Sequence, residues 1–212
     1  MEQGSDPRVG NKGKLLNESE WSRTYELPGH QVYRESKFLK EGLNASSIDV
    51  LRRWPTWSEG ERLEFANAFW CKPKLTSDDH EIIRFLMKEP SLDVRRAVAI
   101  RSCELPSPEE AVDLLVSSIQ QSADDYANFL QPLAILRHPR ALPLLVALHD
   151  QLEATVESGA GKNPYRIIDY LWCSKALYAL TREPRFSELI TRFLTHPDKP
   201  VRSCAEQLLK MA

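Results

Sequence analysis

Two segments of the chain distinguish a helical bundle from a stacked array of helical hairpins: EPSLDVRRAVA at residues 89–99 and HPDKPVRSCAE at residues 196–206. In each segment, one helix is expected to end at a short loop that contains proline, and the next helix begins with valine and arginine. Small residues such as Ala97 and Ala205 follow. A loop and a helix start that recur in this form predict an array of similar units.

From residue 46 onward, the chain reads as a series of short helices separated by proline and by helix-capping residues. Residues 58–61, 78–81 and 107–110 each place a capping side chain three residues before a glutamate, the pattern of a capping box. Asn163-Pro164 adds a cap followed by proline at the first helical position. Apolar residues recur at helical spacing, and no run alternates as a strand would. The sequence therefore predicts an all-α fold.

The two Val-Arg segments resemble the start of the second helix in HEAT and HEAT-like repeats. Val94 and Val201 match the valine of that family, and Arg95 and Arg202 match its arginine. The resemblance implies a right-handed α-α superhelix of about five HEAT-like helical hairpins, an armadillo-like helical fold or α-solenoid whose second helices line a concave surface. The expected hairpins are 46–71, 78–104, 107–137, 139–181 and 184–212, and the third and fourth lack the Val-Arg pair.

The arginines of the two segments have two interpretations. We expect Arg95 and Arg202 to bind neighbouring loop aspartates and so form a ladder inside the array. The alternative is a basic stripe on the concave face. The basic residues on or next to the expected second helices are Arg95, Arg96, Arg101, Arg137, Arg140, Arg166, Lys175, Arg182 and Arg202.

The first part of the chain differs in composition from the rest. Residues 1 to about 14 contain three glycines and few large apolar side chains, and an aromatic segment with a Leu-Pro-Gly turn follows. We expect residues 1–45 to form a flexible tail and an irregular N-terminal arm. Residues 46–212 are the expected HEAT-like helical repeat domain.

Composition and charge exclude several classes of protein. The chain has 28 basic and 30 acidic residues and a formal net charge of -2, so bulk charge does not indicate nucleic-acid binding. The N-terminus lacks a signal-peptide core, and no window approaches the roughly 18 apolar residues of a membrane span. We expect a cytoplasmic location and no membrane partner. The four widely spaced cysteines are expected to be buried, reduced thiols.

A search for chemically active residue patterns finds none that is complete. The five histidines include no pair of histidines four residues apart and no neighbouring cysteine, so their spacing does not indicate a zinc site. Gly159-Ala160-Gly161-Lys162 lacks the remaining residues of a phosphate-binding loop. The pairs Asp78-Asp79 and Asp124-Asp125 fit helix starts. We expect no metal, no cofactor and no catalytic residue, which favours a non-enzymatic protein.

The predicted function is a scaffold or adaptor that binds a protein or peptide partner on the concave face of the array. The partner-binding candidates are Trp57, Arg96, Arg101, Arg137, Arg166, Trp172 and Lys175. The alternative interpretation is that Trp57 seals the first hairpin and that Trp172 belongs to the core.

Nucleic-acid binding is the main alternative function. Some HEAT-like DNA glycosylases use a basic groove with aromatic and acidic residues, and this interpretation requires the arginines to share a face with Asp169 and Trp172, which are neighbours at helical spacing. HEAT-like units also occur in bilin lyases, but no active-site residues match. In all these cases the fold alone cannot establish the function.

Overall fold

The computed structural model describes residues 46–211, apart from 71, 73, 123–125 and 159–162. Within these residues it contains ten α-helices and no strand, which confirms the all-α prediction. The predicted tail and arm, residues 1–45, lie outside the described residues. The chain forms two compact units that divide after Asp79.

The first unit contains α4 (Ser47–Arg53), the 3-10 helix η1 (Trp54–Thr56), α5 (Glu59–Trp70) and the start of α6 (Ser77–Leu86). The predicted capping box at the start of α5 is confirmed. The backbone N–H of Ser58 donates to Oε2 of Glu61 at 2.9 Å, and the N–H of Glu61 donates to Oγ of Ser58 at 3.3 Å. Two N–H groups at the helix start are thereby satisfied.

An aromatic cluster forms the core of this unit. The ring centroids of Trp54 and Trp57 lie 5.4 Å apart, and Phe65 lies 6.0 Å from Trp54 and 5.2 Å from Trp57. Phe69 extends the cluster at 6.1 Å from Phe65. Trp54 belongs to η1 and Trp57 follows it, whereas the two phenylalanines lie on the buried side of α5. The tilted and edge-on contacts between these rings therefore join η1 to α5.

The capping box predicted at Asp78 and Glu81 is wrong by two residues. The cap is Thr76, whose N–H donates to Oδ2 of Asp79 at 2.6 Å and whose Oγ1 accepts from the N–H of Asp79 at 3.3 Å. Asp79 is also fully buried and forms an ion pair with Lys72, with Nζ and Oδ1 2.7 Å apart. Thr76 and Asp79, three residues apart, therefore form the capping box of α6, and the ion pair with Lys72 adds a further contact to the same carboxylate.

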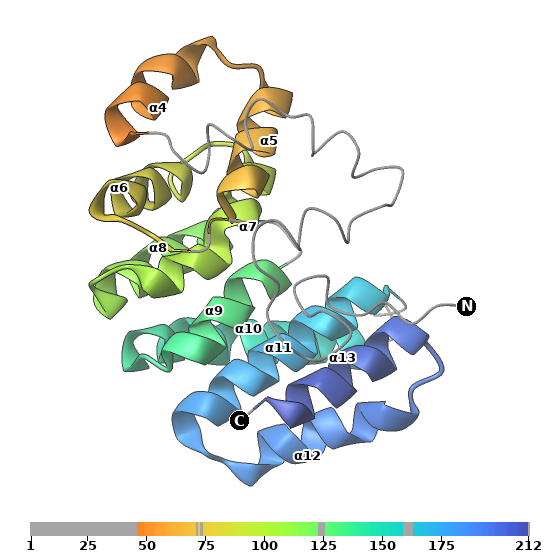
Figure 1. Cartoon of the computed structure of the whole chain (residues 1–212). Helices are drawn as coiled ribbons and strands as arrows, with labels where there is room; N and C mark the ends of the chain where they lie inside the picture. Colours follow the sequence, from red (N-terminus) through yellow and green to blue (C-terminus); the bar gives the residue numbers. More distant parts are fainter. Residues whose placement is uncertain (1–45, 71, 73, 123–125, 159–162, 212) are drawn as a thin grey trace, which may run out of the picture. The chain divides into compact units, whose positions relative to one another are not determined.

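The second unit begins within α6 and continues through seven further α-helices (Figure 1). They are α7 (Leu92–Val98), α8 (Pro108–Gln120), α9 (Ala127–Leu136), α10 (Leu142–Glu157), α11 (Pro164–Thr181), α12 (Pro184–Arg192) and α13 (Lys199–Lys210). Short 3-10 helices follow α7 as η2 (Ala99–Glu104), precede α10 as η3 (Pro139–Ala141) and follow α12 as η5 (Phe193–Thr195).

Helix caps in this unit largely follow the sequence prediction. Oγ of Ser107 accepts from the N–H of Glu110 at 3.2 Å, and Oδ1 of Asn163 accepts from the N–H of Tyr165 at 3.0 Å. The Glu110 side chain does not complete its box, because it accepts a hydrogen bond from Nε of Arg84 at 2.8 Å. The predicted caps are correct, and the box at α8 is only half formed.

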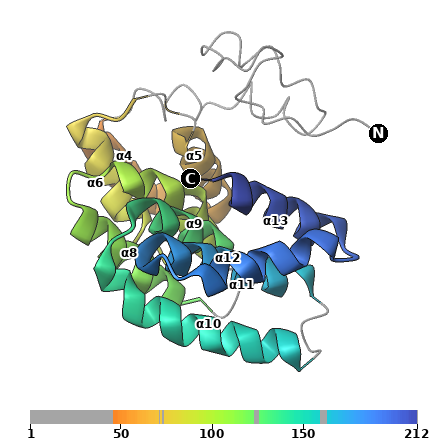
Figure 2. The same cartoon turned by 90° about the horizontal axis from the view of Figure 1, so that it is seen from below.

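Helix α11 is the centre of the second unit. It packs on α9, α10, α12 and α13, and η2 packs on α9. Figure 1 shows α11 between α9 and α13, and Figure 2 shows the same helices turned by 90°. The second helices of consecutive pairs, α9, α11 and α13, therefore lie side by side, and the first helices α10 and α12 also cover α11.

The two Val-Arg segments make the same contact at the two ends of this unit. Nη1 of Arg95 donates to the carbonyl oxygens of Glu89 and Pro90, and Nη1 of Arg202 donates to those of His196, at 2.5 Å, and Pro197, at 2.7 Å. The acceptors lie six and five residues before the arginine in both segments. The expected ladder of arginines and loop aspartates is therefore wrong, because the arginines bind the loop carbonyls that end the preceding helix.

The described cysteines are free thiols, as predicted, but only one of them is fully buried. Cys173 is buried, whereas Cys103 and Cys204 are half-buried, and Cys71 lies outside the described residues. Burial raises the pKa of Cys103 to about 12 and that of Cys204 to about 11. These thiols therefore remain protonated at neutral pH and are poor nucleophiles.

Candidate functional site

Both tryptophans among the partner-binding candidates have buried side chains. Trp57 is 7% exposed and lies in the aromatic cluster of the first unit, and Trp172 is 7% exposed within α11. Their contacts are with the core of their own units. This placement favours the packing role that the sequence left open for each of them.

Three of the arginine candidates are engaged by neighbours. Nη1 of Arg96 lies 3.2 Å from Oδ1 of Asp93, and Nη1 of Arg101 lies 3.0 Å from Oε1 of Glu104. The guanidinium of Arg166 lies over the ring of Tyr126, 5.9 Å from its centroid. These contacts hold the three arginines at separate places on α7, η2 and α11.

Asp169 has a structural role at the centre of the second unit. Its Oδ1 accepts a hydrogen bond from the backbone N–H of Ala127 at 2.7 Å, and its side chain is buried. A carboxylate at this position satisfies an N–H group at the start of α9. Asp169 and Trp172 share α11 but are both buried, so neither presents a reactive group on an open surface.

The structure does bring two of the candidates, Arg137 and Lys175, together with a third cation, Arg182. Nζ of Lys175 lies 5.8 Å from the ring centroid of Tyr178, and the guanidinium carbon of Arg182 lies 5.9 Å from the same centroid. Arg137 lies near enough to lower the pKa of Lys175. We call Lys175, Tyr178 and Arg182 the cationic cluster.

Two of these cations have a local explanation in the helix ends. Arg137 is the C-cap of α9 and Arg182 the C-cap of α11, and both adopt left-handed backbone conformations, with φ of 51° and 60°. Each cap N–H donates to the carbonyl four residues earlier, Leu133 or Tyr178. The negative end of a helix favours a cation there. The left-handed conformations of Arg137 and Arg182 therefore end the two helices, and the chain reverses direction before His138-Pro139 and Glu183-Pro184.

Lys175 is not explained in this way, because it lies inside α11 and is only 6% exposed. Its Nζ donates to the backbone carbonyl of Met211 at 2.5 Å, which is a neutral acceptor. Burial lowers the pKa of Lys175, and the charges of Arg137 and Arg182 lower it further. A carboxylate from outside this cluster would offset both effects, because an opposite charge stabilises the ammonium.

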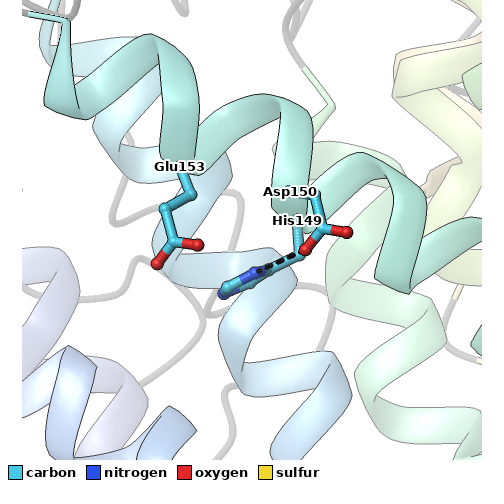
Figure 3. Close-up of side chains that lie close together, drawn as sticks. All are labelled: His149, Asp150 and Glu153. Carbon is cyan, nitrogen blue, oxygen red and sulfur yellow. Dashed lines mark ion pairs between the residues drawn. The ribbon is translucent and has the colours of Figure 1, made fainter.

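A second candidate site is a cavity of about 200 Å³ between α10, α11 and α12. Three side chains of α10 lie on its wall, those of His149, Asp150 and Glu153, and Figure 3 shows the imidazole between the two carboxylates. The remaining lining residues are Val146, Leu177, Arg185, Phe186, Leu189 and Arg192.

The imidazole of His149 is 7% exposed and lacks hydrogen bonds within the described part of the chain. Its ring centroid lies 4.9 Å from that of Tyr170 and 5.3 Å from that of Phe186. Nδ1 lies 3.9 Å from Oδ1 of Asp150, which is beyond hydrogen-bond distance, and Nε2 has no partner. A buried polar group left in this state costs about 1–3 kcal/mol.

The charge state of His149 follows from its surroundings. Burial lowers its pKa, and this effect outweighs Glu153 and Asp150, which raise it. The imidazole is therefore neutral at pH 7, with a free lone pair on one nitrogen. Glu153 is held in place, because its Oε1 accepts a hydrogen bond from the Tyr170 hydroxyl at 2.8 Å.

The sequence search missed this group because it tested histidine pairs and neighbouring cysteines alone. His149 and Glu153 are four residues apart, and residues at this spacing lie on one face of a helix whatever their type. A search for histidine followed four residues later by a carboxylate would have found the pair.

Comparisons with known proteins leave the two candidate sites without an assigned role. The chain matches no protein-family model, and no curated protein or solved structure is significantly similar to it. Among the described residues, none of the helices has the length and apolar character needed to cross a membrane.

Proposed function

We propose that this protein is a non-enzymatic scaffold of HEAT-like helical hairpins that binds an acidic segment of a partner protein. In this proposal, five hairpins stack as a right-handed superhelix. The helix pairs α4/α5, α6/α7, α8/α9, α10/α11 and α12/α13 match the five ranges expected from the sequence, except that α6 starts one residue before its range, and this agreement supports the division into hairpins. The side-by-side packing of α9, α11 and α13 supports stacking within the second unit.

The contacts of Arg95 and Arg202 further support a repeated unit. The same atom of each arginine binds carbonyls at the same two offsets, although the two loops differ in sequence. A buried valine, Val94 or Val201, precedes each arginine. An array of such units offers its second helices as an extended surface for a partner.

The observation that carries the binding proposal is the lack of an acidic partner for the cationic cluster. Among the described residues, neither Lys175 nor Arg182 forms an ion pair, and both lie against the ring of Tyr178. An aspartate or glutamate side chain accepts hydrogen bonds from both an ammonium and a guanidinium. The Tyr178 ring, which both cations approach, would pack against the stem of such a side chain.

The nucleic-acid alternative rests on the same cations, because a phosphate would also be attracted to them. The net charge of -2 provides no long-range attraction for a polyanion. Arg96 and Arg101 are already paired with acidic neighbours. A protein carboxylate therefore suits this cluster better than a nucleic-acid backbone.

Fluorescence anisotropy of a labelled glutamate-rich peptide, with single-stranded DNA of equal charge as the competing probe, tests the proposal. We expect the wild type to bind the peptide, and R182E and K175M to weaken binding at least about tenfold, because each removes a charged hydrogen bond. R140E is the matched control, since Arg140 is exposed and pairs with Asp113. Stronger binding of DNA, or equal binding by all the variants, contradicts the proposal.

A further inference from the structure

The cavity beside α10 brings three metal-ligating groups together. The ligating atoms of His149, Asp150 and Glu153 all lie within 4.8 Å of one another. Ligands of a tetrahedral zinc ion, at about 2.0–2.2 Å from the metal, lie about 3.4 Å apart. Nδ1 of His149 and Oδ1 of Asp150 are 3.9 Å apart, and the Asp150 side chain is 75% exposed and so free to rotate toward an ion.

The buried imidazole gives a reason for an ion at this place. The side chain of His149 is more than nine-tenths buried, its Nε2 is buried without a hydrogen-bond partner among the described residues, and its Nδ1 lies 3.9 Å from Oδ1 of Asp150. Buried polar groups in proteins nearly always have a partner. Figure 3 shows the imidazole and both carboxylates on the same side of α10, with a ring nitrogen facing Asp150.

The surrounding groups favour a cation over an anion. Nε of Arg185 is 2.7 Å from Oε2 of Glu183, and its guanidinium lies on the ring of Phe186, so its charge is already engaged. Arg192 remains as the only other basic residue on the cavity wall. The two negative charges of Asp150 and Glu153 therefore outnumber the one positive charge, that of Arg192.

The hydrogen bond from Tyr170 to Glu153 provides a support that metal sites commonly have. The Tyr170 hydroxyl binds Oε1 of Glu153 and leaves Oε2 without a described hydrogen bond. Partners of this kind orient a ligating carboxylate. One nitrogen and two carboxylate oxygens form a ligand set suited to zinc and its neighbours among the transition metals, rather than to calcium or magnesium.

We propose that His149, Asp150 and Glu153 bind one divalent transition-metal ion, with Zn²⁺ as the best match. This site is separate from the proposed scaffold function and does not depend on it. Three protein ligands leave one tetrahedral position of the ion, which a water molecule fills. Because all three ligands come from α10, the ion would link successive turns of this helix beside α11 and α12.

Calorimetric titration of the chelator-treated full chain with Zn²⁺ tests the site. We expect one equivalent to bind the wild type, and E153Q and D150N to weaken the affinity at least about tenfold, because each removes a ligand charge. Glutamine at 153 retains an acceptor for the Tyr170 hydroxyl, so this variant keeps the local fold. E157Q is the matched control, since Glu157 is exposed one turn further along α10 and lies outside the ligand set.

A second measurement separates this site from zinc bound by cysteines or other histidines. In a nitrogen-15 NMR spectrum of the wild type, added Zn²⁺ should shift a ring nitrogen of His149, and bound Co²⁺ should show no thiolate absorption. The proposal is overturned if Zn²⁺ does not bind, if both carboxylate variants bind it as the wild type does, if only one of them weakens binding, or if the His149 resonances do not move.

Discussion

Replacement of Asp79 by asparagine tests the buried ion pair at the start of α6. Asp79 accepts hydrogen bonds from Nζ of Lys72 at 2.7 Å, from the N–H of Thr76 at 2.6 Å and from its Oγ1 at 2.8 Å. Asparagine keeps one oxygen acceptor and the size of the side chain but removes the charge. The buried ammonium of Lys72 then loses the charge of Asp79.

The magnitude follows from the distance and the burial of the pair. Two unit charges 2.7 Å apart attract each other by about 6 kcal/mol at an effective dielectric constant of about 20. Desolvation of both groups offsets part of this attraction, and removal of one partner from a buried pair costs about 3–5 kcal/mol. D79N should therefore lower the free energy of unfolding of the first unit by about 3–5 kcal/mol.

Urea denaturation followed by tryptophan fluorescence measures this change, because Trp54 and Trp57 lie in the same unit. D78N is the matched control: Asp78 is exposed in the first turn of α6, and loss of its charge should cost about 0.3–1 kcal/mol. If D79N and D78N differ by less than about 1 kcal/mol, the ion pair does not stabilise the unit as we infer.

The same ion pair leads to a prediction about stability at low pH. Burial alone would raise the pKa of Asp79, but the hydrogen bonds from Lys72 and Thr76 outweigh it, and the pKa lies below its ordinary value of 3.8. An acid with a lowered folded pKa stabilises the fold above its unfolded pKa, and this contribution is lost as the pH falls through the folded value. The difference between the wild type and D79N should stay constant down to about pH 5 and shrink below 3.8.

Two further predictions concern the repeated Val-Arg segments. Val94 and Val201 are fully buried, so V94D and V201D should each lower stability by about 3–5 kcal/mol in thermal melts, and unchanged melting of both would contradict the packing of the second helices. R95M and R202M should each cost about 1–3 kcal/mol in urea denaturation, because each removes the arginine hydrogen bonds to two loop carbonyls. A large cost for one arginine and none for the other would show that the two contacts are not equivalent.

The sequence predicted best those features that depend on a few neighbouring residues. The capping box of Ser58 and Glu61 and the cap at Asn163 follow from contacts within three residues, and the structure has them. The start of α6 was misplaced because two capping patterns overlap in the sequence, and the structure uses that of Thr76 and Asp79 rather than that of Asp78 and Glu81. Local patterns thus predict that a helix starts here, but overlapping patterns do not fix its first residue.

The candidate sites were harder to predict because they join residues from several helices. Arg137 and Lys175 were among the predicted residues, but their proximity depends on the packing of α9 against α11. Arg95 and Arg202 were expected to bind aspartates, although a backbone carbonyl at the end of a helix also needs a donor. The burial of His149 between two rings depends on α11 and α12, and the sequence shows only its spacing from Glu153.

Affinity purification of the tagged protein from its source cells tests the proposed scaffold function most directly. The wild type, R182E and R140E would be compared with and without nuclease and at two salt concentrations, with bound proteins identified by mass spectrometry. We predict one stoichiometric protein with an acidic segment, retained after nuclease, retained with R140E and lost with R182E. Nucleic acid that is released steeply by salt, or the same bound proteins with R182E as with the wild type, would contradict the proposal.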